Sequence, residues 1–202
     1  PVNPVVRVFD LSTHQFYEVH VDDLTKYEWD DTLRKKIILP EDQRELLDIL
    51  TSDLGTFSSD LIEGKSAGST IVCKGEPGVG KTLSAEVFSE VVHRPLYSIH
   101  SGSLGATAED VRENLEAVFQ RAKRWNAVLL LDEADVFVLE RKENLTQNAI
   151  VAEFLRTMEY FDGLMFMTTN RADDIDDAIL SRAVAVIHYH TPEGEDLDRS
   201  WQ

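Results

Sequence analysis

The sequence has very little cysteine and no long hydrophobic run. The single cysteine, Cys73, excludes a disulfide within the chain, and its apolar surroundings predict a small buried hydrophobic residue. The longest apolar runs, such as Ala127 to Leu131, are far too short to cross a bilayer, and no charged-then-apolar leader opens the sequence. We therefore expect a soluble protein with no membrane segment, in a reducing, cytoplasmic setting.

Positive charge is also scarce. The chain has 20 Lys and Arg residues against 37 Asp and Glu residues, which gives a formal net charge of -17. The averaged field of such a protein repels phosphate backbones, so general nucleic-acid binding is disfavoured. The densest basic stretches, Arg34 to Lys36 and Arg121 to Arg124, are interpreted as solvated positions.

Apolar residues are plentiful enough for a real core. The 202 residues are 43% hydrophobic, which fits one domain, or one domain with a small appendage. Alternating apolar residues at 5–11 and 16–21, joined by turn residues 12–15, predict a β-hairpin extension within residues 1–28. A helical stretch is predicted from Pro40 to Leu50.

From Thr70 onward, short apolar runs alternate with longer amphipathic runs, which is the pattern of a parallel sheet with crossover helices. The predicted strands are Thr70 to Lys74, Leu96 to His100, Val128 to Asp132, Leu164 to Thr168 and Val184 to His188. The predicted helices are Lys81 to Val92, Ala108 to Trp125, Thr146 to Phe161 and a short one from Ile175 to Leu180. The fold class is therefore α/β, with a five-stranded parallel sheet sandwiched by helices.

Residues 75–82 match the phosphate-binding pattern G-x-x-x-x-G-K-[ST], and they stand between a predicted strand and a predicted helix, as this pattern requires. Glycines allow the main-chain N–H groups to point into one concavity, where they and the helix N-terminus can hold phosphate oxygens. Lys81 would reach the outer phosphates, and the Thr82 hydroxyl would bind Mg²⁺. The alternative is a glycine turn with an incidental lysine.

The apolar strand from Val128 to Leu131 ends in two adjacent acids, Asp132 and Glu133. Unpaired carboxylates at the end of a buried strand are costly unless a cation or a water meets them. Asp132 would hold the hydration shell of Mg²⁺, and Glu133 would polarise the water that attacks the terminal phosphorus. The alternative is that both acids are solvated residues that merely follow a strand.

A polar amide, Asn170, follows the strand Leu164 to Thr168. In open α/β sheets, ligands bind outside the carboxyl ends of the strands, where all three elements would meet. Asn170 could orient the attacking water or sense the terminal phosphate. Its alternative role is that of a turn-forming residue before Arg171.

With these elements in order, followed by the segment Asp176 to Arg182, residues 29–192 resemble the large subdomain of an AAA+ ATPase. The resemblance implies a P-loop NTPase fold, ATP and Mg²⁺ as cofactors, and an assembly, usually hexameric, with active sites between subunits. It implies nucleotide contacts from the Walker A motif, at Glu76, Pro77, Gly78, Val79, Gly80, Lys81, Thr82 and Leu83. It also implies a Walker B pair at Asp132 and Glu133 and a first sensor residue at Asn170.

By the same resemblance Arg182 is an arginine finger that acts on the ATP of a neighbouring subunit, so that catalysis requires assembly. The alternative for Arg182 is an ordinary surface arginine.

The chain departs from the family at two places. In unfoldase members of the family, a loop that lines the central pore carries an aromatic residue that grips the substrate polypeptide. The matching residues 103–105 are Ser-Leu-Gly, so we expect at most a weak apolar hold on a substrate from Leu104. Residues 193–202 are similar to the start of a helical lid cut short, and with Pro1 at the other end this suggests a piece of a longer protein with weak ATP binding and low activity. The adenine would rest near residues 29–39, against Ile37 and Ile38.

Three functions remain open. The leading hypothesis is an ATP phosphohydrolase of the AAA+ type that remodels an unknown protein substrate in an oligomeric ring. The alternatives are an ATP-binding assembly switch with little hydrolysis and a DNA-associated initiator or loader. A zinc enzyme is disfavoured because the close pair His188 and His190 lacks a third ligand.

Overall fold

A computed structural model describes most of the chain. The described residues are 3–30, 32–33, 45, 49, 68–138, 145–171 and 175–191. Four predictions fall outside these ranges: the solvated basic stretch at 34–36, the adenine walls Ile37 and Ile38, the helix at 40–50 apart from residues 45 and 49, and the lid that would start at residue 193.

The body of the protein is a five-stranded parallel sheet, which confirms the predicted fold class. Its strands are β3 (Ser69–Gly75), β4 (Leu96–His100), β5 (Val128–Asp132), β6 (Leu164–Thr169) and β7 (Ala185–Tyr189). They lie in the order β4-β5-β6-β3-β7. Since β3 and β5 both neighbour β6, the sheet brings the carboxyl ends of three motif-bearing strands side by side.

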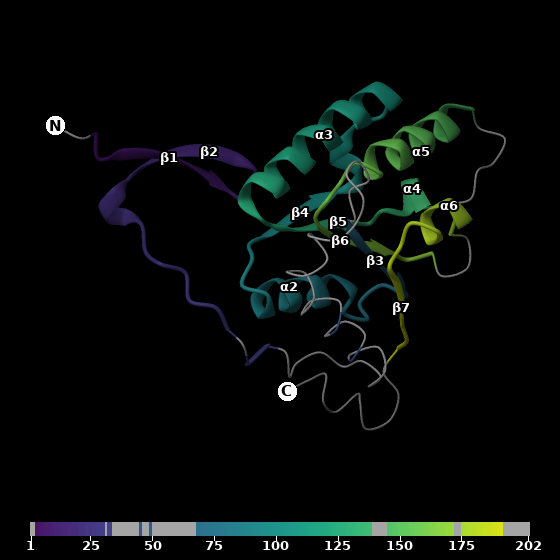
Figure 1. The fold of residues 1–202 in the computed structure, drawn as a ribbon, viewed down its shortest axis with the longest axis horizontal. Coiled ribbons are helices and arrows are strands. Elements are labelled where there is room, and N and C mark those ends of the chain that lie inside the picture. The colour runs from purple at the N-terminus through teal and green to yellow at the C-terminus, as the bar shows by residue number, and fades with distance from the viewer. Residues whose placement is uncertain are drawn as a thin grey trace.

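Helices cover both faces of the sheet (Figure 1). The helix α2 (Lys81–Val91) lies on one face, and α3 (Ala108–Trp125), α4 (Asp135–Val138), α5 (Leu145–Met158) and α6 (Asp177–Leu180) lie on the other. Within the described residues, no helix combines the length and the hydropathy that crossing a membrane demands.

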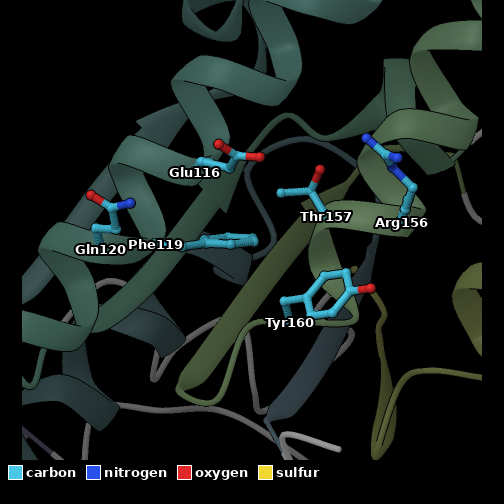
Figure 2. A pocket seen from close by; sticks show the side chains of 6 residues that line it. All are labelled: Glu116, Phe119, Gln120, Arg156, Thr157 and Tyr160. Carbon is cyan, nitrogen blue, oxygen red and sulfur yellow. The ribbon is translucent and has the colours of Figure 1, made fainter. Parts of the chain in front are cut away.

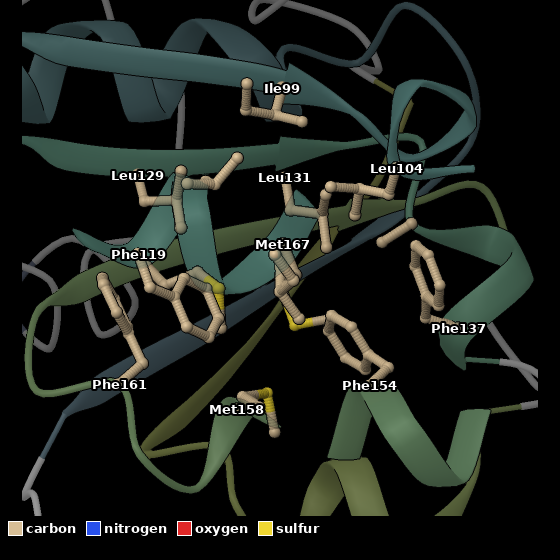
Figure 3. Packing of buried hydrophobic residues seen from close by; sticks show 14 of the residues in the cluster. Ile99, Leu104, Phe119, Leu129, Leu131, Phe137, Phe154, Met158, Phe161 and Met167 are labelled. Atoms are coloured by element: carbon tan, nitrogen blue, oxygen red, sulfur yellow. The ribbon is translucent and has the colours of Figure 1, made fainter. Parts of the chain in front are cut away.

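Two cores form because successive residues of a buried strand point to opposite faces. Leu129 and Leu131 of β5 join the cluster under α3 and α5, whereas Val128 and Leu130 join the cluster under α2. Figure 3 shows the larger cluster, where the Phe137 and Phe154 rings stack at 4.5 Å. The strands that carry the functional motifs are therefore fixed from both sides.

Cys73 lies in the smaller cluster and is fully buried, as the sequence predicts. Burial raises the pKa of its thiol to about 12, so this cysteine stays protonated near neutral pH.

The helix α3 begins and ends where its sequence predicts. The Thr107 hydroxyl accepts a hydrogen bond from the Asp110 amide at 3.1 Å, which caps the first turn. At the other end Asn126 takes a left-handed conformation with φ of 51° and closes the helix. An apolar stripe of α3, which includes Leu115 and Val118, is buried in the core.

The N-terminal hairpin consists of β1 (Val5–Asp10) and β2 (Gln15–His20), each within about one residue of its predicted bounds. It is attached to the body through Phe9, whose ring lies 4.7 Å from that of Trp125 and 6.0 Å from that of Tyr97. Whether residues 1–28 form a separate unit stays a prediction.

The segment after the hairpin reaches the far end of α2. The Tyr27 hydroxyl donates to Glu90 Oε1 at 2.5 Å, and the amide of Asp30 donates to Glu90 Oε2 at 3.0 Å. The Trp29 ring stacks on His93, with ring centroids 5.6 Å apart. We call residues 24–30 the strap, because they tie the hairpin to the C-terminal end of α2.

Candidate active site

The phosphate-binding loop connects β3 to α2 at the carboxyl edge of the sheet. Gly78 and Gly80 have φ of 82° and 94°, values that side chains rarely tolerate. A Cβ atom added at either glycine would meet nothing within 4 Å. These positions therefore require glycine for backbone conformation and not for space, and the turn leads directly into the N-terminus of α2, where amide groups can bind an anion.

Lys81 opens α2 and bends back over the loop. Its Nζ donates to the carbonyl oxygens of Gly75 at 2.8 Å and Glu76 at 2.6 Å, and to Asn170 Oδ1 at 2.9 Å. The side chain is only 7% exposed. Burial lowers the pKa of the ammonium group, and the charges of Asp132 and Asp135 oppose this shift. The structure thus brings together the predicted lysine and the predicted sensor amide.

Asp132 ends β5 beside the second residue of α2. The Thr82 hydroxyl donates to Asp132 Oδ1 at 3.1 Å, and the Thr168 hydroxyl donates to the same oxygen at 2.5 Å. The structure therefore places the two predicted metal ligands in direct contact.

Glu133 follows in an unusual conformation. Its φ is 53°, in the left-handed region, which costs a residue with a Cβ roughly 1–2 kcal/mol. Its amide donates to Thr168 Oγ1 at 3.0 Å, and its carbonyl oxygen accepts from Ser101 Oγ at 2.5 Å. The residue is exposed, and its carboxylate has no hydrogen bond to any residue in the described ranges. The backbone is thus held while the acid itself stays available.

Asn170 is positioned from behind by Asp135. The carboxylate Oδ1 of Asp135 accepts from the Asn170 amide at 3.0 Å and from the Thr169 hydroxyl at 2.5 Å. Since the side chain of Asn170 contacts Lys81, one chain of hydrogen bonds runs from the start of α4 to the start of α2.

The donor set at this edge suits Mg²⁺ rather than zinc. Thr82 and Asp132 offer hydroxyl and carboxylate oxygens, the hard ligands that Mg²⁺ prefers, together with water and phosphate. Among the residues that the structure describes, no group of three or more His, Cys, Asp or Glu side chains could hold a metal. The loop and the acids thus fit a phosphate-bound Mg²⁺, for which the protein supplies few ligands.

Arg182 does not join this cluster. Its guanidinium pairs with Glu159, just past the end of α5, and donates to the carbonyl oxygen of Ala178 at 2.9 Å. Its side chain is one third exposed, at 33%. Arg182 thus lies among α5 and α6 residues, apart from the lysine and acids of its own chain.

The expectation that Leu104 offers an apolar hold is wrong. This residue is 1% exposed and belongs to the core under α3, in a short 3-10 helix, Ser101–Leu104. Its carbonyl oxygen accepts from Asn114 Nδ2 at 3.1 Å, which pins the turn to α3. The local packing, not the loop position, decides where this side chain points.

Three residues of the site are missing from the sequence prediction: Ser101, Asp135 and Thr168. Each holds a predicted site residue by hydrogen bonds across strands or turns. The two threonines that end β6 directly before Asn170 are the signal that could have pointed to one of them.

A second concavity, of about 440 Å³, lies between α3 and α5 (Figure 2). Glu116 and Phe119 of α3 point toward Thr157 of α5 there. Arg156, which lines it, is paired with Glu153 at 2.6 Å. No member of the Lys81 and Asp132 cluster lines it, so it is a different surface from the site at the sheet edge.

Comparison with known proteins places these elements in context. Residues 71–191 match the family described as "ATPase family associated with various cellular activities (AAA)". This stretch includes the phosphate-binding loop, both acids, Asn170 and Arg182.

Individual relatives are similar over the same region. An uncharacterized AAA family ATPase, y4kL of Sinorhizobium fredii, is 29% identical over 135 residues, which cover 62% of this chain and 40% of that protein. Spastin of Dictyostelium discoideum is 31% identical, over 60% of this chain and 20% of that protein. The ATP-dependent zinc metalloprotease FtsH of Ureaplasma parvum is 32% identical, over 54% of this chain and 16% of that protein. The chain thus matches less than half the length of each of these relatives.

One solved structure, that of the E. coli MS115-1 HORMA:CdnC:Trip13 complex, contains a chain with the same fold. It matches with a TM-score of 0.60 and 20% identity, over 81% of this chain and 67% of that one.

Proposed function

The chain belongs to the AAA family of ATPases, and from that premise we propose that it binds Mg²⁺-ATP and hydrolyses it. One observation carries the proposal: Lys81 and Thr82 from the start of α2 meet Asn170 and Asp132 from the ends of β6 and β5. Family membership supports an ATPase in general, and the contacts of Lys81 with Asn170 and of Thr82 with Asp132 support the assignment of roles to residues.

The loop and Lys81 would bind the phosphates. The amide groups at the start of α2 offer N–H donors, and the glycine turn before them leaves open space beside Gly78 and Gly80. Lys81 would hold the outer phosphate oxygens through its ammonium group, which already lies between the loop and β6. Burial lowers the pKa of this group, and an anionic phosphate beside it would oppose that shift and favour the charged form.

Thr82 and Asp132 would hold the metal. When bound, Mg²⁺ neutralises charge on the phosphate oxygens and withdraws electrons from the phosphorus that is attacked. Asp132 supplies the negative charge, and its position is fixed by the hydroxyls of Thr82 and Thr168.

Glu133 would act on the attacking water. Its exposed carboxylate stands one residue beyond the metal ligand and has no hydrogen bond to occupy it among the described residues. It can therefore accept the proton of a water as the water attacks the terminal phosphorus. Asn170 would orient this water or contact the terminal phosphate, since it already contacts Lys81.

Assembly would complete the site. Arg182 lies apart from the lysine and acids of its own chain, so we propose that it serves the ATP of a neighbouring copy in a ring, with six copies as the expected number. The free energy of hydrolysis would drive remodelling of a protein substrate. The net charge of -17 disfavours a DNA loader as the alternative.

The test is the substitution Glu133→Gln, measured by phosphate release and by calorimetric titration with Mg²⁺-ATP. Turnover should fall by about 100-fold or more, while ATP affinity stays within a few-fold, because the amide cannot accept a proton but keeps the shape. Glu86→Gln, a change at an exposed glutamate of α2, is the matched control and should turn over ATP like the wild type.

Equal turnover in the Glu133→Gln variant and the wild type would refute the water-activating role. If ATP shifted the sedimentation of the wild type without any phosphate release, the assembly switch would replace the hydrolase.

A further inference from the structure

Thr168 bridges the two acids that follow each other at the end of β5. It is the last residue but one of β6, and it is only 2% exposed. Its hydroxyl donates to Asp132 Oδ1 at 2.5 Å and accepts from the Glu133 amide at 3.0 Å. One buried hydroxyl thus contacts both residues that would hold the metal and activate the water.

The direction of these hydrogen bonds is fixed by chemistry. A backbone N–H can only donate, so Thr168 Oγ1 is the acceptor toward Glu133, and its single proton is directed at Asp132. The hydroxyl has no second proton to give elsewhere. Asp132 and Glu133 are consequently held in a constant relation to one another.

The backbone of the same threonine holds the next residue. The carbonyl oxygen of Thr168 accepts from the Ala134 amide at 2.8 Å. Glu133, between these two anchored amides, keeps its left-handed φ of 53°. Such a conformation persists in a residue other than glycine only when neighbouring groups over-determine it, and Thr168 supplies two of the hydrogen bonds that do so.

We propose that Thr168 is a positioning residue for the reaction, which fixes Asp132 toward the metal and Glu133 toward the water. The inference rests on the proposed ATPase function, but it assigns a role to a residue that would touch neither ATP nor Mg²⁺. It separates Thr168 from Thr82, which contacts the same carboxylate oxygen but would itself ligate the metal. The hydroxyl is the essential feature, and the methyl group is not.

The test compares Thr168→Val, which keeps the shape and removes the hydroxyl, with Thr168→Ser, which keeps the hydroxyl. The valine variant should turn over ATP about 10- to 100-fold more slowly than the wild type. The Mg²⁺ concentration at which ATP binding is half-maximal should be about tenfold higher than for the wild type. Its affinity for ATP in EDTA should stay within about threefold of that of the wild type, because the loop is untouched. The serine variant should stay within about threefold of the wild type in all three measurements.

The matched control is Thr157→Val. Thr157 is also a buried threonine, whose hydroxyl donates to the Glu153 carbonyl oxygen at 2.9 Å within α5, away from the acids. This control should retain wild-type turnover and Mg²⁺ dependence. Circular dichroism and thermal unfolding of all variants separate loss of folding from loss of positioning, and Thr168→Ala replaces the valine variant should that one not fold.

Wild-type turnover and Mg²⁺ dependence in the Thr168→Val variant would overturn the inference. So would a serine variant as defective as the valine variant, since the hydroxyl would then not be the cause. A wild-type chain that neither binds Mg²⁺-ATP nor releases phosphate would instead overturn the proposed function, so the two failures are distinguishable.

Discussion

Two turns at the same edge of the sheet use left-handed backbone in different ways. The loop between β3 and α2 obtains its positive φ angles from Gly78 and Gly80, and no side chain presses on either position. The turn after β5 places a glutamate, Glu133, at a φ of 53° and surrounds it with hydrogen bonds from Thr168 and Ser101.

The difference follows from what each turn presents. The loop presents main-chain amides, so its residues need no side chain, and glycine adopts the conformation without steric cost. The turn presents a carboxylate, so glycine is excluded and the conformation must be enforced by neighbours. At this edge of the sheet, the left-handed Glu133 therefore presents its side chain, whereas the left-handed Gly78 and Gly80 present their backbone.

The largest expected effect comes from a substitution that removes the Glu133 carboxylate and also relieves the left-handed strain of its backbone. Glu133→Gly should reduce turnover by about 100-fold or more, like the glutamine variant. Its unfolding free energy should nevertheless exceed that of Glu133→Ala by about 1 kcal/mol, because alanine keeps the left-handed strain and glycine does not. Chemical denaturation measures the difference. Equal stability of the two variants would mean that residue 133 is not strained.

The second effect comes from adding a Cβ to the loop. Gly80→Ala should lower the unfolding free energy by roughly 1–2 kcal/mol, since φ is 94°, and should weaken ATP binding about tenfold as the amides turn away. Gly102→Ala is the matched control, because Gly102 has open space and no positive φ, and it should change stability by less than about 0.5 kcal/mol. If both variants bound ATP equally well, the glycine turn would not shape the site.

The smallest effect should come from Ser101→Ala, which removes one of the hydrogen bonds that hold Glu133. It should cost about 1 kcal/mol in stability and at most about fivefold in turnover, because the bonds from Thr168 remain. Ser103→Ala, which removes a hydrogen bond to the His100 carbonyl oxygen in the same 3-10 helix, should leave turnover unchanged. If Ser101→Ala were as inactive as Thr168→Val, the 3-10 helix and not β6 would be the main support of Glu133.

The sequence predicts the regular elements well because their patterns are strong and local. The predicted bounds of β4 and β5 agree with the structure, since β4 alternates apolar and polar residues after a proline and β5 is an apolar run that ends in an acid. The helix α5 ends at Met158, earlier than predicted, because the buried Phe161 extends the apolar periodicity past the last turn. The four-residue helix α4 is too short for any periodicity to reveal it.

The candidate site could likewise be predicted from the sequence only in part. Lys81, Thr82, Asp132 and Glu133 lie within contiguous motifs, which a single sequence can disclose. Ser101 and Thr168 reach Glu133 only through strand register, in which His100 pairs with Asp132 and Met167 pairs with Leu131. Register between parallel strands depends on the packing of the whole sheet, so a polar residue at a strand end cannot be assigned to its partner beforehand.

The strap attaches α2 at the end opposite to the phosphate-binding loop. The helix is continuous over 11 residues, about 16 Å, with the phosphate-binding loop at one tip and Glu90, held by Tyr27 and Asp30, near the other. A rod of this length, hydrogen-bonded throughout, does not compress appreciably. The strap and the phosphate-binding loop thus lie at opposite ends of one stiff rod.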